Sequence, residues 1–96
     1  MQIPTTARVP VLVVTNRTGI QRSVDTLLSW NPHWEVCGHA ENYREAVEKI
    51  LELGPHVVVL DVNALETNCT EAIHEIRRIA PTIKTVIFGR DAQRNP

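Results

Sequence analysis

The chain has 96 residues, of which 43% are hydrophobic and 22% are charged. This length and composition predict a single domain over residues 1–96, with a core over 8–89 and a polar tail over 90–96, and exclude a disordered chain or a disulfide miniprotein. The net charge of −1 argues against strong nucleic-acid binding. No apolar run approaches the ~18 residues of a membrane helix, and no signal peptide is recognisable. We therefore expect a cytoplasmic protein with no membrane contact and no direct contact with nucleic acid.

The first half of the chain predicts two strands, each followed by a helix. Residues 9–14 (VPVLVV) are almost entirely apolar, which is typical of a strand covered on both faces, and residues 34–40 (WEVCGHA) alternate as a half-exposed or edge strand does. Capping boxes predict where the two helices start. The capping pairs are Thr18 with Gln21 and Asn42 with Glu45. The two helices carry the apolar stripes Ile20, Val24, Leu27, Leu28 and Tyr43, Ala46, Val47, Ile50, Leu51.

The second half repeats this alternation. Residues 57–60 (VVVL) predict a second fully apolar strand that ends directly at Asp61, and residues 83–88 (IKTVIF) predict a fourth strand. A polar loop over residues 63–70 leads from Asp61 into a helix between these two strands. The apolar stripe of this helix is Ala72, Ile73, Ile76, Ile79 and Ala80.

Strands that alternate with helices predict an open parallel α/β sheet with right-handed crossovers and helices on both faces. In such sheets ligands bind at the carboxyl ends of the strands. Those ends here are Thr15–Asn16, Asp61 and Gly89. We therefore look for function at these positions.

The run HVVVLDVNALETNCTEAIHEIRRIAP resembles the phosphoacceptor segment of response-regulator receiver domains. The stripe AENYREAVEKILELG and the run VPVLVVTNRTGIQRSVDTLLSWNPHWEVCGHA are similar to the preceding elements of that family. The resemblance covers residues 8 to about 91 and is closest to the branch with a C-terminal helix-turn-helix output domain. It implies a flavodoxin-like fold with strand order 2-1-3-4, lacking the family's fifth strand and last helices.

The resemblance also assigns roles at the strand ends. Asp61 occupies the phosphoacceptor position of the family. Thr15 and Asn16 occupy the positions of two acidic residues that hold Mg²⁺ with that aspartate, and the backbone carbonyl of Asn63 is a further metal ligand. Gly89 stands at the position of the switch Ser or Thr. The family's lysine at the end of the fifth strand lies beyond this chain.

These departures predict a degenerate receiver. Mg²⁺ prefers anionic oxygens, and Thr15 and Asn16 offer only neutral ones, so we expect at most weak Mg²⁺ binding and no required cofactor. Because the metal neutralises charge during phosphoryl transfer, its loss slows that step by orders of magnitude. Gly89 has no hydroxyl to hold a phosphoryl oxygen. The expectation is that the chain is not an enzyme and that its phosphorylation switch is largely lost.

Asp61 has two interpretations. It is either a residual phosphoacceptor or, as we favour, a structural carboxylate that loop amides or an arginine satisfy. Arg17 and Arg90 both leave this edge of the sheet, and we expect one of the two to pair with Asp61.

Two functions remain open. The first is a signalling module that binds a protein partner or itself, with a homodimer expected, through the edge of the fourth strand or the sheet face near Val11 and Val13. The second is a working phosphoacceptor that a histidine kinase phosphorylates on Asp61 in a two-component phosphorelay controlling transcription.

The charge is distributed unevenly along the chain, at −7 over residues 35–75 and +4 over 76–96. We interpret this asymmetry first as a solvated surface.

Overall fold

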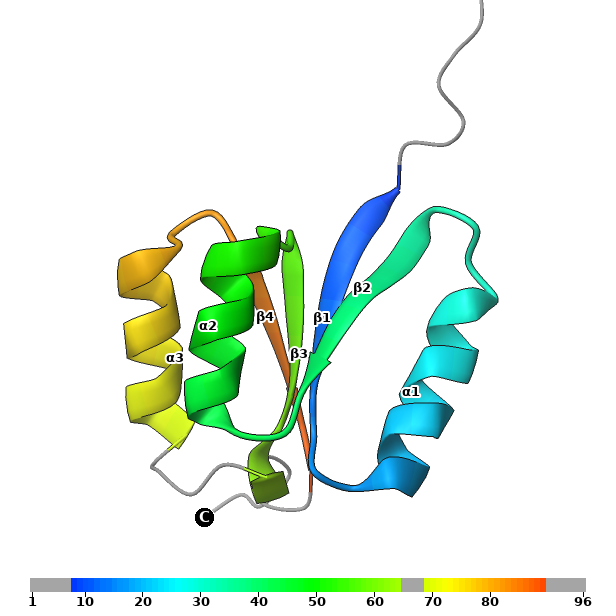
Figure 1. Ribbon diagram of the computed structural model, residues 1–96, viewed down its shortest axis with the longest axis horizontal. Coiled ribbons are helices and arrows are strands. Elements are labelled where there is room, and N and C mark those ends of the chain that lie inside the picture. Colours follow the sequence, from blue (N-terminus) through cyan, green and yellow to red (C-terminus); the bar gives the residue numbers. More distant parts are fainter. Residues whose placement is uncertain (1–7, 65–68, 90–96) are drawn as a thin grey trace, which may run out of the picture.

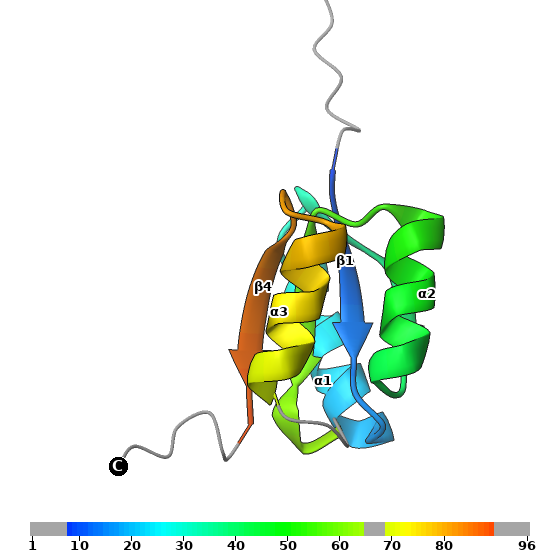
Figure 2. The same cartoon turned by 90° about the vertical axis from the view of Figure 1, so that its left-hand side faces the viewer.

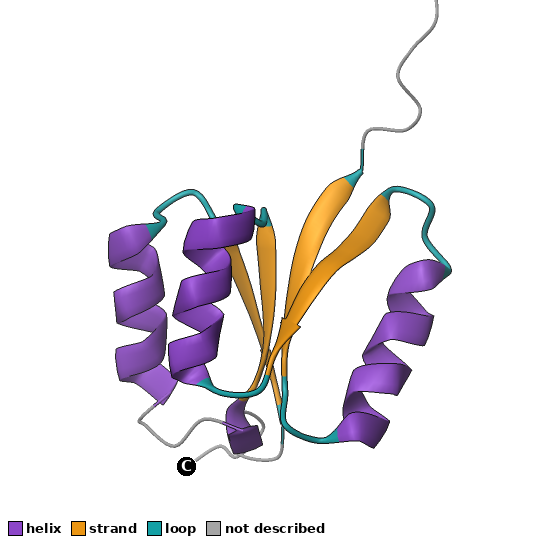
Figure 3. Cartoon of the chain, in the orientation of Figure 1, coloured by secondary structure: helices purple, strands orange, loops and turns teal. Residues whose placement is uncertain are grey.

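Figure 1 shows the computed structural model of the chain, which describes residues 8–64 and 69–89. Four strands alternate with three α-helices, as Figure 3 shows by colour. In chain order the elements are β1 (Val9–Val14), α1 (Thr18–Ser29), β2 (Trp34–Ala40), α2 (Tyr43–Leu53), β3 (Val57–Asp61), the 3₁₀ helix η1 (Val62–Ala64), α3 (Cys69–Ile79) and β4 (Lys84–Phe88). The strands form one parallel sheet in the order β2-β1-β3-β4. This confirms the predicted fold class and strand order.

The helices cover the sheet unequally. Helices α2 and α3 lie on one face and α1 alone lies on the other (Figure 1). The core under α2 and α3 consists of buried aliphatic side chains that alternate along the strands and pack against apolar side chains of the two helices. Its members are Leu12, Val14, Ala40, Ala46, Ile50, Val58, Leu60 and Ile76. This alternation follows from the two-residue period of a strand.

The core on the α1 side is smaller. Val11, Val13, Val57 and Val59 face α1 and are at most 9% exposed. Val11 and Val13 are fully buried, so the expectation that the sheet face near them is open is wrong: the α1 side of the sheet packs its apolar side chains, Val24 and Leu28 among them, over this cluster. On the same sheet face, Val86 of β4 stays 48% exposed.

The two predicted capping boxes have different outcomes. Asn42 caps α2, because its side chain accepts a hydrogen bond from the Glu45 backbone N–H at 2.8 Å. The Thr18 prediction is wrong by one residue. Arg17 is the N-cap of α1 in an extended conformation, no side chain caps this helix, and Thr18 is already its first residue. The side chain of Arg17 binds Asp61, and this contact fixes the residue at which α1 begins.

No helix in the described part of the chain is long and apolar enough to cross a membrane.

The difference between the two caps predicts a difference in stability. Asn42→Ala removes a side-chain bond to an otherwise unsatisfied N–H and lowers the free energy of unfolding by about 1 kcal/mol. Thr18→Ala removes no cap and changes it by less than about 0.5 kcal/mol. Urea denaturation followed by circular dichroism measures both values. Equal losses in the two variants would contradict the assignment of Arg17 as the N-cap.

Candidate functional site

The carboxyl ends of three adjacent strands meet at one edge of the sheet. Thr15 follows β1, Asp61 is the last residue of β3, and Gly89 follows β4. Because β1 and β3 are parallel neighbours, their ends bring together the side chains of Thr15 and Asp61, which lie 46 residues apart in sequence. The functional residues predicted from the sequence therefore lie at this edge.

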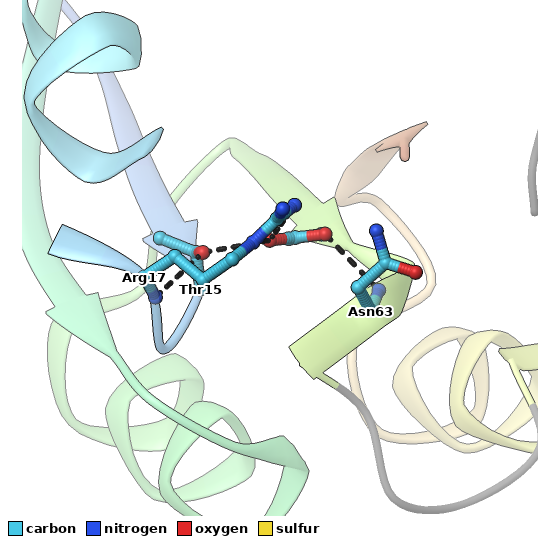
Figure 4. Close-up of polar contacts among 4 residues, drawn as sticks. Thr15, Arg17 and Asn63 are labelled. Atoms are coloured by element: carbon cyan, nitrogen blue, oxygen red, sulfur yellow. Dashed lines mark hydrogen bonds and ion pairs between the residues drawn. The ribbon is translucent and has the colours of Figure 1, made fainter. Parts of the chain in front are cut away.

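Asp61 lies at the centre of this edge and is fully buried. Its Oδ2 accepts three hydrogen bonds (Figure 4): from Thr15 Oγ1 at 2.7 Å, from Arg17 Nη2 at 2.9 Å and from Arg17 Nε at 3.1 Å. A buried carboxylate without donors would be strongly destabilising, so this set of donors is what allows Asp61 to remain inside the protein as an anion.

The second carboxylate oxygen is less crowded. Oδ1 accepts one hydrogen bond, from the backbone N–H of Asn63 at 3.0 Å. This bond arises because η1 turns the chain directly after β3 and returns the Asn63 amide to the strand end. Within residues 8–64 and 69–89 the two oxygens of Asp61 therefore differ, since Oδ2 contacts a cation and a hydroxyl while Oδ1 contacts a single amide.

Arg17 reaches Asp61 from the loop between β1 and α1. Its backbone N–H donates to Thr15 Oγ1 at 3.2 Å, so Thr15 accepts from the backbone of Arg17 and donates to Asp61. The Arg17 side chain is 46% exposed, and the partner carboxylate is fully buried. The guanidinium thus closes the site from the solvent side, and the carboxylate and guanidinium charges cancel.

The other predicted site residues do not all contact Asp61. Of the two arginines expected near Asp61, Arg17 makes the ion pair, and Arg90 lies outside the described residues. Asn16 is exposed at the surface. Asn63 contributes its backbone N–H to Asp61. In the described residues, no three His, Cys, Asp or Glu side chains are grouped as metal ligands.

Gly89 is held in a conformation that favours glycine. Its φ is +128°, and a Cβ atom added there would lie 2.6 Å from Val62 Cγ2 and 3.4 Å from Asp61 Oδ1. The backbone of this residue therefore approaches the carboxylate closely where the family carries a hydroxyl side chain. A side chain at this position requires both a new backbone conformation and a shift of Val62.

Sequence reasoning missed the role of Thr15 as a hydrogen-bond donor. Thr15 was assigned as a weak metal ligand because of its position in the family pattern. Its 2% exposure and its bond to Asp61 make it instead a support for the carboxylate. The sequence does carry a signal for this role: a hydroxyl residue follows a strand that is expected to pair with the strand ending in a buried acid.

Two curated relatives resemble the chain in sequence. Chemotaxis protein CheY of Thermotoga maritima is 46% identical over 60 residues, which are 62% of this chain and 50% of that protein. A protein-glutamate methylesterase/protein-glutamine glutaminase of a Nocardioides species is 33% identical over 84 residues, or 88% of this chain and 23% of that protein. The chain thus spans half or less of the length of these relatives. No family model matches the chain.

A solved structure agrees with these relatives. The response regulator domain of Thermotoga maritima CheB has a TM-score of 0.75 at 27% identity and covers 85% of this chain and 60% of that chain. The strand order and the acid at the carboxyl edge define an open α/β domain of flavodoxin-like architecture. Together with the sequence likeness, they place the chain in a family: it belongs to the response-regulator receiver domains of two-component systems.

The Arg17–Asp61 pair predicts a loss of stability on truncation of the arginine. Arg17→Ala leaves the buried carboxylate with Thr15 and Asn63 as donors and lowers the free energy of unfolding by about 1–3 kcal/mol. This is less than the loss for a fully buried pair, because water can reach the vacated position. Arg22→Ala, at an exposed position of α1, is the matched control and changes the value by less than about 0.5 kcal/mol. Equal effects in thermal or urea denaturation would show that the ion pair carries no stability.

The backbone of Gly89 leads us to expect that a serine at this position, which would restore the family's hydroxyl, destabilises the domain. Gly89→Ser forces a β-carbon into a positive-φ residue against Val62 and lowers the free energy of unfolding by about 1–3 kcal/mol. Gly19→Ser is the control, because a Cβ atom there meets nothing within 4 Å. Urea denaturation of both variants measures the difference. A Gly89→Ser variant as stable as the parent would contradict the described backbone.

Proposed function

We propose that this receiver domain acts in signal transduction by binding proteins, with its phosphorylation switch largely lost. The observation that carries the proposal is the guanidinium of Arg17 on Asp61 Oδ2, at 2.9 and 3.1 Å. The family places Mg²⁺ beside this carboxylate, and the chain places a covalently tethered cation there. Arg17 supplies charge neutralisation that cannot be exchanged or carried away with a phosphoryl group.

The donor set around Asp61 does not fit Mg²⁺. The ion prefers anionic oxygens and gives up its water reluctantly. Here Asp61 is the one carboxylate among the site residues described, Thr15 offers a hydroxyl already bonded to it, and Asn16 is exposed. A second cation would also be repelled by the guanidinium. We infer that the domain needs no cofactor and binds Mg²⁺ weakly or not at all.

The remaining chemistry supports a binding role over an enzymatic one. Burial raises the pKa of the Cys37 thiol, so this residue is a poor nucleophile near neutral pH. Gly89 gives the site no hydroxyl to bind a phosphoryl oxygen and move the loop. The proposed module is a cytoplasmic, non-enzymatic protein that binds a protein partner or a second copy of itself, without membrane contact and without direct contact with nucleic acid.

One observation supports a second function. Among the described residues, Asp61 Oδ1 accepts a single hydrogen bond, from Asn63 N–H, which leaves a lone pair with which to attack phosphorus. In that case a histidine kinase or a small phosphodonor transfers its phosphoryl group to Oδ1: the new O–P bond forms as the donor's bond to phosphorus breaks. The chain would then be a working phosphoacceptor in a two-component phosphorelay controlling transcription.

Intact mass after incubation with acetyl phosphate and Mg²⁺ separates the two functions. We expect no phosphoryl adduct on the parent chain or on the Asp61→Asn variant, because the guanidinium holds Oδ2 and no acidic pair recruits the metal. The triple variant Thr15→Asp, Asn16→Asp, Arg17→Ala restores the acids and removes the tethered cation, and we expect an adduct there. Circular dichroism establishes that each sample is folded.

The outcome that overturns the proposal is an adduct on the folded parent chain that is absent from Asp61→Asn. That result would assign phosphoacceptor chemistry to Asp61 in spite of Arg17. The absence of an adduct from both, with the triple variant labelled, supports a domain whose signalling depends on contact.

A further inference from the structure

An open hollow of about 490 Å³ lies between α1 and β2, and all the residues that line it belong to residues 8–39. In the strand order β2-β1-β3-β4, β2 and β4 are at opposite ends of the sheet, and Figure 2 shows β4 at its left border. Two strands separate β2 from β4, so the two lie roughly 14 Å apart. A sheet that continues beyond β4 grows away from the hollow.

A β-bulge in β2 directs His39 into this hollow. The pairing of β2 with β1 shifts by one residue at Cys37. After the shift, His39 pairs with Val13 on the sheet face that α1 covers, the same face on which Trp34 and Val36 pack earlier in the strand. Strict alternation along β2 would place His39 on the opposite face. The bulge therefore brings the imidazole to α1.

Asp25 of α1 meets the imidazole at the lining of the hollow. Nε2 of His39 lies 3.1 Å from Oδ1 and 3.0 Å from Oδ2 of Asp25. Because a carboxylate only accepts, Nε2–H donates, and the two oxygens share one proton. The side chains of His39 and Asp25 are 37% and 35% exposed. A carboxylate offers about four acceptor positions, so Asp25 has room for further donors from the solvent side.

The lining combines negative charge with an aromatic ring. Two of its residues, Asp25 and Glu35, are carboxylates, and one, Arg8, is a cation. In the part of the chain that the structure describes, neither Glu35 nor Arg8 takes part in an ion pair. Half-buried Trp34 and Leu28 supply apolar surface. An arginine side chain suits this lining, because its planar fork binds carboxylates and its plane stacks on an indole.

The surroundings of the hollow attract the same kind of ligand. Residues 35–53, which include β2 and α2, carry five glutamates against one arginine and one lysine. A surface with an excess of one charge raises the local concentration of ligands of the opposite charge. A second copy bound through the same face would bring like charges together, which disfavours it as the occupant.

We propose that the hollow between α1 and β2 binds an arginine side chain from a basic segment of a partner protein. This rests on the proposed function, since it names a surface and a class of partner through which the module acts. The guanidinium binds the carboxylates of Asp25 and Glu35, and the indole of Trp34 and the side chain of Leu28 contact its planar and aliphatic parts.

A set of three peptides tests the proposal on the full chain. The probe is acetyl-Leu-Arg-Leu-amide, and its two comparison peptides carry citrulline or lysine in place of arginine. We expect saturable amide and indole N–H shifts in NMR, concentrated in residues 25–39. Citrulline keeps the planar shape but loses the charge, so it weakens binding by about fivefold or more, and lysine weakens it by about two- to threefold. Added salt reduces the difference between the arginine and citrulline peptides.

Matched variants decide whether the lining is responsible. Asp25→Asn and Glu35→Gln each lower the affinity for the arginine peptide by about threefold, and Arg8→Gln raises it by a similar factor, because it removes a competing cation. Glu48→Gln is the control, the same charge change at an exposed position of α2 outside the lining, and leaves the affinity within about twofold. Circular dichroism establishes that each variant is folded.

Several outcomes would overturn the proposal. They are the absence of peptide binding, equal binding of the arginine and citrulline peptides, shifts outside residues 25–39, and an affinity that neither Glu35→Gln nor Arg8→Gln changes. A dimer in light scattering that already protects the amides of β2 would do the same, because the occupant would then be a second copy.

This test is independent of Asp61. Asp61→Asn leaves the lining of the hollow unchanged and is expected to bind the arginine peptide as the parent does. Absence of peptide binding together with absence of an acetyl phosphate adduct would reject the hollow and leave the module proposal in place. Peptide binding by a chain that does take up phosphoryl would reject the inert carboxylate and leave the hollow in place.

Discussion

A buried carboxylate needs compensation, and the carboxyl edge of this domain is organised around that constraint. Asp61 is fully withdrawn from water at the end of the central strand β3. Its position depends on donors from two directions, with Thr15 and Arg17 on one oxygen and the amide of Asn63 on the other. Because an unpaired buried charge costs several kcal/mol, these contacts tie the geometry of the loops to the stability of the strand.

The same constraint explains where α1 begins. Arg17 is the N-cap of this helix although arginine is a poor capping residue, and its side chain turns to the carboxylate while its backbone bonds to Thr15. The first helix thus starts where the guanidinium can reach Asp61. A local rule, the capping box at Thr18, gives way to a long-range ion pair. Helix α2 has no such demand at its start, and Asn42 caps it as the sequence predicts.

The sequence predicted the fold well because the apolar runs and stripes are long and their periods are clear. The alternation of buried strands at residues 9–14 and 57–60 with amphipathic helices leaves few other arrangements, and family resemblance supplies the strand order. The site was predicted in part: Asp61 and its two candidate arginines were named, but the choice between Arg17 and Arg90 depends on how loops fold back, which residue spacing does not encode. The hydroxyl of Thr15 was missed for the same reason.

A tethered cation and a bound metal ion can each neutralise a carboxylate, but they differ in what the site can do afterwards. A metal can bind, leave and follow a phosphoryl group, so the site has two states and can report a signal. A guanidinium on a short loop is always present, so it holds the carboxylate of its own chain in one state. A receiver fold stabilised in this way retains its surfaces, while its carboxyl edge becomes part of the architecture. Under the proposed function, information then enters through the occupancy of a surface, and the concentration of a partner replaces phosphorylation as the variable.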